Sequence, residues 1–267
     1  MSNDSSSVPA VSTVPPDDPA ARPAGWHPVT AIVWVIVGFI ASSFVAQGGV
    51  LLAYMLFGHH SAEQAIDVMN SSITAQFLSV GLTEAALVGT IYAFVRRRGG
   101  NMRDLGLRRP QAIDIPWALL GIVVYIVLYI VAVSIAVATL HIDTKGQQDL
   151  GFNDPIGTQA LILTAISLIV FPPLAEEIVF RGFLFTSLLR RWNVWVAGLV
   201  TSVLFAIPHV LEGQGGKALW IAGIDTLILS VVLCTLRYKT KRIWAGVLIH
   251  MLKNSLAFAA LYVFHWQ

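Results

Sequence analysis

Cysteine and charge are both scarce in this 267-residue chain. Only 12% of the residues are charged, whereas 56% are hydrophobic, a balance far from that of a typical soluble domain. The single cysteine, Cys234, lies within an apolar run, so no intrachain disulfide can form. A formal net charge of +2, with no basic stripe, gives no sign of a nucleic-acid partner. The composition instead indicates a membrane protein with the lipid bilayer as its surroundings.

Strand-like alternation and internal repeats are also missing. The apolar runs are continuous, which favours helices over a β-barrel, and a helix crosses the bilayer core with roughly 20 apolar residues. The sequence therefore predicts an all-α, polytopic transmembrane bundle of seven helices. An eighth would have to lie inside the first span or in the 141–158 loop. The predicted spans are about 30–57, 73–95, 115–140, 159–189, 193–211, 218–237 and 243–264.

The first residues differ from the rest of the chain. Residues 1–27 are rich in Ser, Pro, Asp and Ala and lack apolar periodicity, so we expect a disordered tail. The tail has no basic n-region and the first apolar run is too long for a signal-peptide core, which favours an uncleaved anchor. We divide the remainder into N-terminal transmembrane helices, 28–158, and a core carrying most of the intramembrane charge, 159–264.

Basic residues predict the orientation. Six arginines lie in the loop 96–109, and further basic clusters follow the fourth and sixth spans, whereas the other three loops hold only Lys145 and Lys217. By the positive-inside rule the even-numbered spans end in the cytoplasm. The sequence thus predicts a cytoplasmic N-terminus and an integral protein of the cell (plasma) membrane.

Ionisable residues interrupt the fourth span. Glu176, Glu177 and Arg181 stand in an apolar run directly after Pro172 and Pro173. Glu177 and Arg181 share a helix face at i,i+4 spacing, while Glu176 lies about 100° round the helix. One carboxylate can therefore be paired with the arginine while its neighbour is available for chemistry. The two prolines would loosen the backbone where polar groups enter.

Two later spans carry further polar residues at the same spacing. Phe205 and His209 lie four residues apart in the fifth span, and His250 and Asn254 lie four apart in the seventh. Taken singly, each of these residues has an ordinary structural explanation. Phe205 could pack against other side chains, either histidine could be a hydrogen-bonded interior residue, and Asn254 could join two helices through its amide. Two carboxylates, an arginine, two histidines and an asparagine on three helices nevertheless favour one polar site inside the bundle.

These residues resemble a known family. "EEIVFR" fits a Glu-Glu-x-x-x-Arg motif, "FAIPH" fits Phe-x-x-x-His, and "HMLKN" fits His-x-x-x-Asn. Their order and spacing are similar to those of the CPBP intramembrane proteases, also called the Abi or CAAX-protease-like family, which include type II CAAX prenyl endopeptidases. The resemblance covers roughly residues 159–260. It implies an intramembrane endopeptidase that hydrolyses membrane-associated or prenylated protein or peptide substrates.

The resemblance also implies roles for the matched residues. Glu176 would act as general base on water, His209 would hold that water, and His250 and Asn254 would donate hydrogen bonds to the oxyanion. Phe205 would contact the substrate. The paired Glu177 and Arg181 complete the predicted catalytic set: Glu176, Glu177, Arg181, His209, His250 and Asn254.

A metal-dependent mechanism is the open alternative. Glu177, His209 and His250 could hold Zn²⁺ with one position left for water, and members of the family are described both as metalloproteases and as glutamate-dependent proteases. However, the histidines lie on separate helices and there is no His-Glu-x-x-His pair. Cofactor use therefore stays open.

Two other functions remain compatible with the sequence. The polar pocket could hold a membrane partner without cleaving it, as in a chaperone or scaffold. The Glu and His residues could instead relay protons in a coupled transporter, although the missing repeats weaken that alternative. One inconsistency also needs an explanation: by helix rise, Glu176 lies about 20 Å and His250 about 10 Å from the cytoplasmic ends of their spans.

Overall fold

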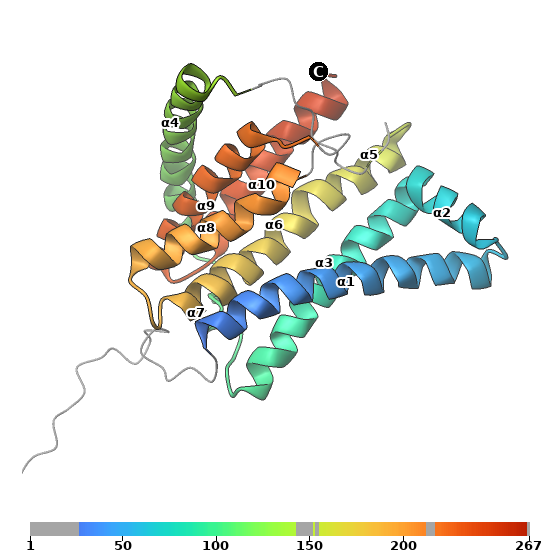
Figure 1. The fold of residues 1–267 in the computed structure, drawn as a ribbon, viewed down its shortest axis with the longest axis horizontal. Coiled ribbons are helices and arrows are strands. Elements are labelled where there is room, and N and C mark those ends of the chain that lie inside the picture. The colour runs from blue at the N-terminus through green and yellow to red at the C-terminus, as the bar shows by residue number, and fades with distance from the viewer. Residues whose placement is uncertain (1–26, 143–151, 153–154, 212–216, 266–267) are drawn as a thin grey trace, which may run out of the picture.

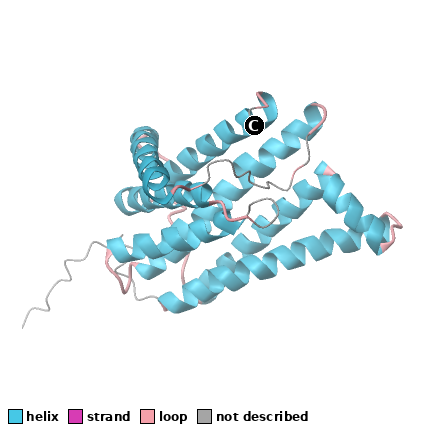
Figure 2. Cartoon of the chain, turned by 45° about the horizontal axis from the view of Figure 1, so that its top comes forward, coloured by secondary structure: helices cyan, strands magenta, loops and turns pink. Residues whose placement is uncertain are grey.

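The computed structural model describes residues 27–142, 152, 155–211 and 217–265, and these form helices and loops without strands (Figure 2). Within them, seven helical segments are long and apolar enough to cross a membrane. The predicted all-α transmembrane bundle is therefore confirmed. The expected disordered tail lies outside the described residues, apart from His27. The spans are Pro28–Phe57, Ile73–Arg97, Asp114–Leu140, Thr158–Leu188, Val194–Leu211, Trp220–Thr240 and Trp244–Val263.

The first span is one continuous helix, α1 (Pro28–Phe57), so no additional spanning helix is hidden inside it. Pro28 suits the first turn, where a missing backbone N–H leaves no bond unmade. A second helix, α2 (Ala62–Ser71), has only 10 residues, and a reciprocal capping box between Ser61 and Gln64 fixes its start. It turns the chain back so that α3 (Ile73–Arg97) packs along α1 (Figure 1). Most of the 141–158 loop lies outside the described residues.

The fourth span, Thr158–Leu188, lies in the middle of the bundle between the α1–α3 pair and helices α8 to α10 (Figure 1). Its two prolines, Pro172 and Pro173, cannot donate backbone hydrogen bonds, and the pattern of helical hydrogen bonds changes on both sides of them. Two of its segments are π-helical. The segments are α5 (Thr158–Ala165), η1 (Ile166–Val170), α6 (Phe171–Glu176), η2 (Glu177–Phe185) and α7 (Thr186–Leu188).

Helix α4 (Asp114–Leu140) packs outside α9 (Trp220–Thr240) and α10 (Trp244–Phe258), and η4 (Ala259–Val263) continues α10. Helix α4 can lie this close to α9 and α10 because residue 121 is a glycine. A Cβ there would lie 2.5 Å from Ile249 Cδ1 of α10 and 2.9 Å from Leu236 Cδ1 of α9. Small residues let transmembrane helices pack this closely. Helix α8 (Val194–Leu211) packs against the other side of α9.

Large apolar side chains cover much of the outer surface. Phe44 is 75% exposed and Ile130 is 56% exposed, for example. Such a surface is expected where lipid, rather than water, surrounds the helices. The protein is therefore an integral membrane protein.

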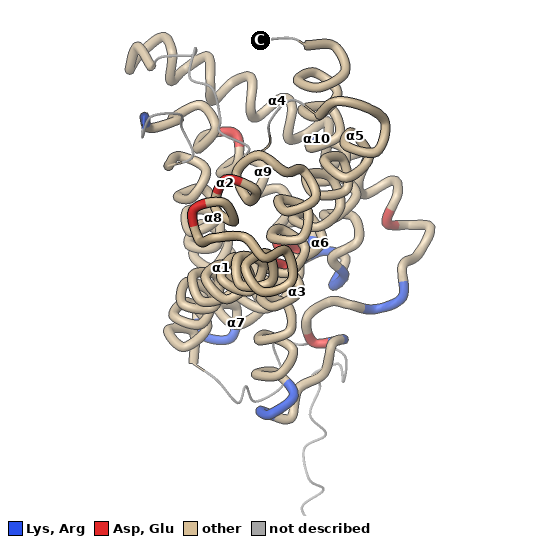
Figure 3. The backbone as a smooth tube through the Cα atoms, turned by 90° about the vertical axis from the view of Figure 1, so that its right-hand side faces the viewer, with Lys and Arg blue, Asp and Glu red and all other residues tan. Residues whose placement is uncertain are grey.

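One end of the bundle is closed by the loop between α3 and α4. Arg237 of α9 is 3% exposed, and its Nη2 donates to the Asp104 carbonyl and to Thr186 Oγ1, each at 3.2 Å. Gly106, at φ +80°, allows this approach, because a Cβ there would lie 2.8 Å from Arg237 Nε. The loop is thereby fixed to both the fourth span and α9. Figure 3 shows most of the described Lys and Arg positions in the lower part of that view, away from the C-terminal end.

Candidate active site

The two glutamates of the fourth span differ in environment. Glu176 ends α6 and its side chain is 20% exposed, whereas Glu177 begins η2 and its side chain is 1% exposed. They are adjacent in sequence, so successive side chains point about 100° apart around the helix. The predicted division into a fixed carboxylate and an accessible one is thus compatible with the geometry.

Arg181 forms the counter-charge for Glu177. Its Nη1 lies 2.9 Å from Glu177 Oε1, and both side chains are buried. The guanidinium carbon lies 4.3 Å from the centre of the Phe205 ring, in a cation–π arrangement. Phe205 is 1% exposed and its ring also lies 5.1 Å from that of His209. In this structure it covers the arginine, and its predicted contact with substrate stays a prediction.

His250 lies between the two carboxylates. Its Nδ1 is 3.6 Å from Glu177 Oε1 and its Nε2 is 3.6 Å from Glu176 Oε2. The imidazole side chain is 5% exposed and its ring meets Phe205 edge-on at 5.9 Å. These separations are longer than a direct hydrogen bond, as is common in sites without substrate. The fourth span and α10 therefore bring both glutamates, Arg181 and His250 into one cluster.

The structure also explains why Glu176 and His250 were predicted at different distances from the cytoplasmic ends of their spans. From Glu176 to the end of the fourth span there are six more residues than from His250 back to the start of α10, which corresponds to about 9 Å of helix. The fourth span therefore extends past the start of α10. Its last turn does not reach water: Leu188 is fully buried, and Thr186 accepts a hydrogen bond from Arg237.

Gly246 is a site residue that the motifs did not reveal. It lies one turn before His250 on α10, and a Cβ there would lie 2.6 Å from Glu177 Oε2. The missing side chain is what lets the carboxylate approach α10. A small residue at i−4 from a histidine in an apolar helix is a usable sequence signal for such an approach.

His209 contributes from α8, next to Pro208. Its Nδ1 lies 3.0 Å from the Phe205 carbonyl oxygen. A carbonyl can only accept, so Nδ1 carries the proton and, in the neutral ring, the lone pair is on Nε2. In this tautomer Nε2 can accept a hydrogen bond from a water molecule, and the predicted role itself remains a prediction.

Asn254 has a partner that the sequence did not suggest. Its Nδ2 donates to the Leu168 carbonyl at 2.9 Å. That carbonyl would normally accept from residue 172 in an α-helix or residue 173 in a π-helix, and both are prolines without an N–H. The amide therefore supplies the hydrogen bond that the two prolines remove. Its predicted contact with an oxyanion is untested and would require the second amide hydrogen or a change of partner.

The geometry gives the zinc alternative no support. In the part of the chain that the structure describes, which includes Glu177, His209 and His250, no group of three or more His, Cys, Asp or Glu side chains is arranged to hold a metal ion. In addition, Glu177 Oε1 already faces a cation, Arg181. Because the donors do not fit an ion in this arrangement, no step is assigned to a metal.

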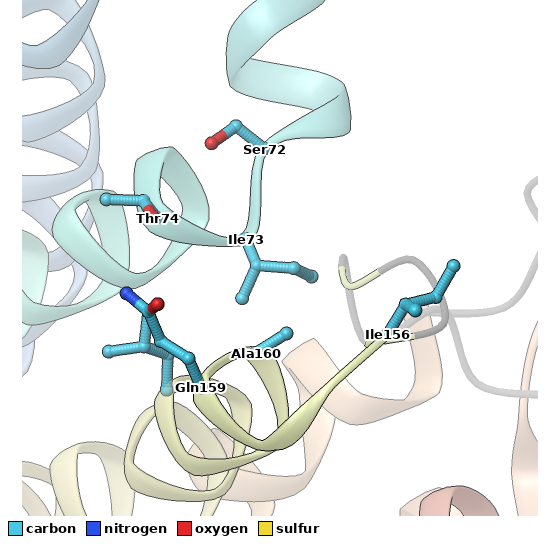
Figure 4. A pocket seen from close by; sticks show the side chains of 7 residues that line it. Ser72, Ile73, Thr74, Ile156, Gln159 and Ala160 are labelled. Carbon is cyan, nitrogen blue, oxygen red and sulfur yellow. The ribbon is translucent and has the colours of Figure 1, made fainter.

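A cavity of about 240 Å³ lies elsewhere, where the α2–α3 corner meets the start of the fourth span (Figure 4). Ser72, Thr74 and Gln159 contribute its polar groups. Gln159 precedes Glu176 by 17 residues, or about 25 Å of helix. This cavity is therefore separate from the glutamate–histidine cluster.

Comparison with known proteins agrees with the motifs. Residues 158–256 match the family described as type II CAAX prenyl endopeptidase Rce1-like. This region is similar to that family. The predicted resemblance is confirmed, and the match contains all six predicted catalytic positions. No solved structure gives a match to the chain.

Individual proteins are also similar to the chain. The chain is 28% identical over 162 residues to "Putative membrane peptidase YdiL" of Bacillus subtilis (strain 168), covering 59% of this chain and 58% of that protein. It is 30% identical over 172 residues to "Membrane-embedded CAAX protease MroQ" of Staphylococcus aureus (strain USA300), covering 57% and 60%. An "Uncharacterized 24.3 kDa protein" of Escherichia coli is 26% identical over 192 residues, 71% of this chain and 82% of that one. Two of these relatives are named as a membrane peptidase and a membrane-embedded protease, and the chain spans about three fifths of the length of each.

Proposed function

We propose that the protein is an intramembrane endopeptidase in which Glu176 activates water. One observation carries the proposal: His250 lies between the partly exposed Glu176 and the buried Glu177, and Arg181 forms an ion pair with Glu177. This difference in surroundings supports a positioning role for Glu177 and a reactive role for Glu176. The substrates are membrane proteins or membrane-associated peptides, among which lipid-modified CAAX-type termini are one class.

The chemistry then follows from the environment of each group. Glu176 takes a proton from water while the water oxygen adds to the peptide carbonyl carbon. It then delivers that proton to the departing amine nitrogen as the C–N bond breaks. Glu177, held by Arg181, orients the imidazole of His250, as a buried carboxylate does for histidine in other hydrolases. His209 holds the water. His250 stabilises the developing oxyanion through Nε2–H, which requires the ring to carry both protons, a state that the flanking carboxylates of Glu176 and Glu177 favour.

A Glu176→Gln variant tests the proposal. The amide has nearly the same shape but cannot accept the proton, so hydrolysis should fall by at least about 100-fold. Folding and membrane insertion should be unchanged. Peptides that accumulate in membranes carrying the variant, compared with the wild type, identify the substrate. A variant that retains full biological effect without cleavage would instead support the chaperone or scaffold function.

Elemental measurement separates the two hydrolytic mechanisms. Active, purified protein should contain no stoichiometric zinc, and chelators should leave its activity unchanged. Zinc that is lost together with activity, and restored together with it, would replace the glutamate mechanism by a metal-dependent one. In that case His209→Ala and His250→Ala should each remove the metal.

A further inference from the structure

An apolar groove runs between α8 and α9, and none of its lining residues belongs to the glutamate–histidine cluster. Its volume is about 440 Å³, within the range of about 300–1,000 Å³ that ligand sites occupy. The buried side chains of Phe185 and Cys234 form its floor, and its lining is almost wholly apolar. Gly198 opens the groove, since a Cβ there would only approach Phe185 and Cys234 at 3.9 Å.

The rim of this groove is amphipathic. Trp195, 82% exposed, and Tyr238, 39% exposed, stand at its end together with Lys239. Aromatic side chains of this kind lie at the level of lipid headgroups. A second lysine lies near this rim: Lys241 Nζ is 4.4 Å from the centre of the Tyr238 ring. The groove therefore has hydrocarbon character inside and positive charge at the headgroup level.

Nearby acidic side chains do not cancel this charge. In the described parts of the chain, no carboxylate forms an ion pair with Lys239, and Asp114 is paired with Arg242 at 2.9 Å. The two segments that form this end of the groove, 189–195 and 235–241, contain no Asp or Glu. By the positive-inside rule this end faces the cytoplasmic leaflet, where anionic lipids concentrate.

We propose that the groove is a binding site for an anionic phospholipid of the membrane. One acyl chain lies between α8 and α9, over the floor formed by Phe185 and Cys234, and the phosphate lies against Lys239. The apolar groove would take the chain of any lipid, whereas the lysine selects a negatively charged headgroup. The site is independent of the proposed hydrolysis.

Native mass spectrometry of the full chain tests this proposal. The protein is presented with phosphatidylglycerol and phosphatidylcholine of identical acyl chains. The wild type should retain phosphatidylglycerol more tightly. Lys239→Gln should weaken that binding about five-fold and leave phosphatidylcholine unchanged, since one lysine near an anionic surface contributes about that factor. Arg97→Gln, at the exposed end of α3, is the charge-matched control and should behave as the wild type.

A second pair of variants tests the groove itself. Gly198→Leu fills it and should remove the tightly held lipid of either headgroup, whereas Gly89→Leu, where a Cβ meets no neighbour within 4 Å, should not. If Gly198→Leu fails to fold, Thr235→Trp fills the groove from the opposite wall. Equal retention of the two lipids by the wild type, or equal losses in Lys239→Gln and Arg97→Gln, overturns the proposal. Displacement of the lipid by a lipidated peptide would assign the groove to substrate instead.

Discussion

At the scale of single residues, the site depends on a buried charge that has more than one partner. Arg181 faces Glu177 at 2.9 Å and the Phe205 ring at 4.3 Å, with no exposure to solvent. Removing one member of a buried pair leaves the other charge uncompensated, which costs far more than the pair itself contributes. The planar guanidinium can meet the carboxylate along its edge and the ring on its face at once, and an ammonium cannot.

Arg181→Ala should therefore lower both stability and activity. The unpaired Glu177 carboxylate should cost about 3–5 kcal/mol of unfolding free energy, measured by thermal unfolding in detergent. Arg181→Lys should recover part of the stability, because the charge returns without the contact to the ring. A normally expressed and fully active Arg181→Ala protein would remove this pair from the mechanism.

A second prediction concerns the close contact between α10 and Glu177. In Gly246→Ala the new methyl group would lie 2.6 Å from Glu177 Oε2, so one of the two must move. We expect a loss of about 1–3 kcal/mol of stability and lower activity, although alanine is the better helix former by up to about 1 kcal/mol. Gly89→Ala, in open space, is the control and should be neutral or slightly stabilising. Similar behaviour of the two variants would show that the contact does not matter.

At the scale of helices, a backbone hydrogen bond that is missing within the fourth span is replaced by a side chain of α10. The Leu168 carbonyl loses its donors to Pro172 and Pro173, and Asn254 of α10 donates to it instead. This bond holds α10 against the fourth span one turn beyond His250. We therefore expect Asn254 to position His250, whether or not its amide also contacts an oxyanion.

A double-mutant cycle measures this bond. Asn254→Ala should cost about 0.5–1.5 kcal/mol in the wild-type background. It should cost clearly less together with Pro172→Ala, because residue 172 then has an N–H that can donate to Leu168. Pro208→Ala, a proline in α8, is the matched control and should give no such rescue. If activity stays low in both backgrounds while stability recovers, Asn254 also acts on the oxyanion.

Sequence reasoning located the spans closely because long apolar runs are a strong signal: the second was predicted at 73–95 and observed at Ile73–Arg97. The motifs also identified residues that do meet, such as Glu176 and His250. The sequence could not show the contact of Gly246 with Glu177 or the partner of Asn254, since both depend on how α10 lies against the fourth span. The two π-helical segments of the fourth span were also missed, because local sequence alone does not specify them.

At the scale of the whole molecule, orientation is the main untested expectation. The loop from Arg96 to Arg109 carries six arginines, which resist translocation. A reporter placed in that loop and another at the N-terminus should both give cytoplasmic signals, and one after Val263 an external signal. An external signal from the arginine-rich loop would invert the assignment of every span.

The docking of the α3–α4 loop by Arg237 has a consequence for biosynthesis. Asp104 and Arg237 are separated by 133 residues in the chain, which a ribosome takes roughly 7 to 27 s to add. During that interval the loop has been made but the arginine that fixes it has not. A ribosome stalled before residue 237 therefore holds a chain whose fourth span is complete but whose loop is undocked, and membrane quality-control proteases should cut it there first.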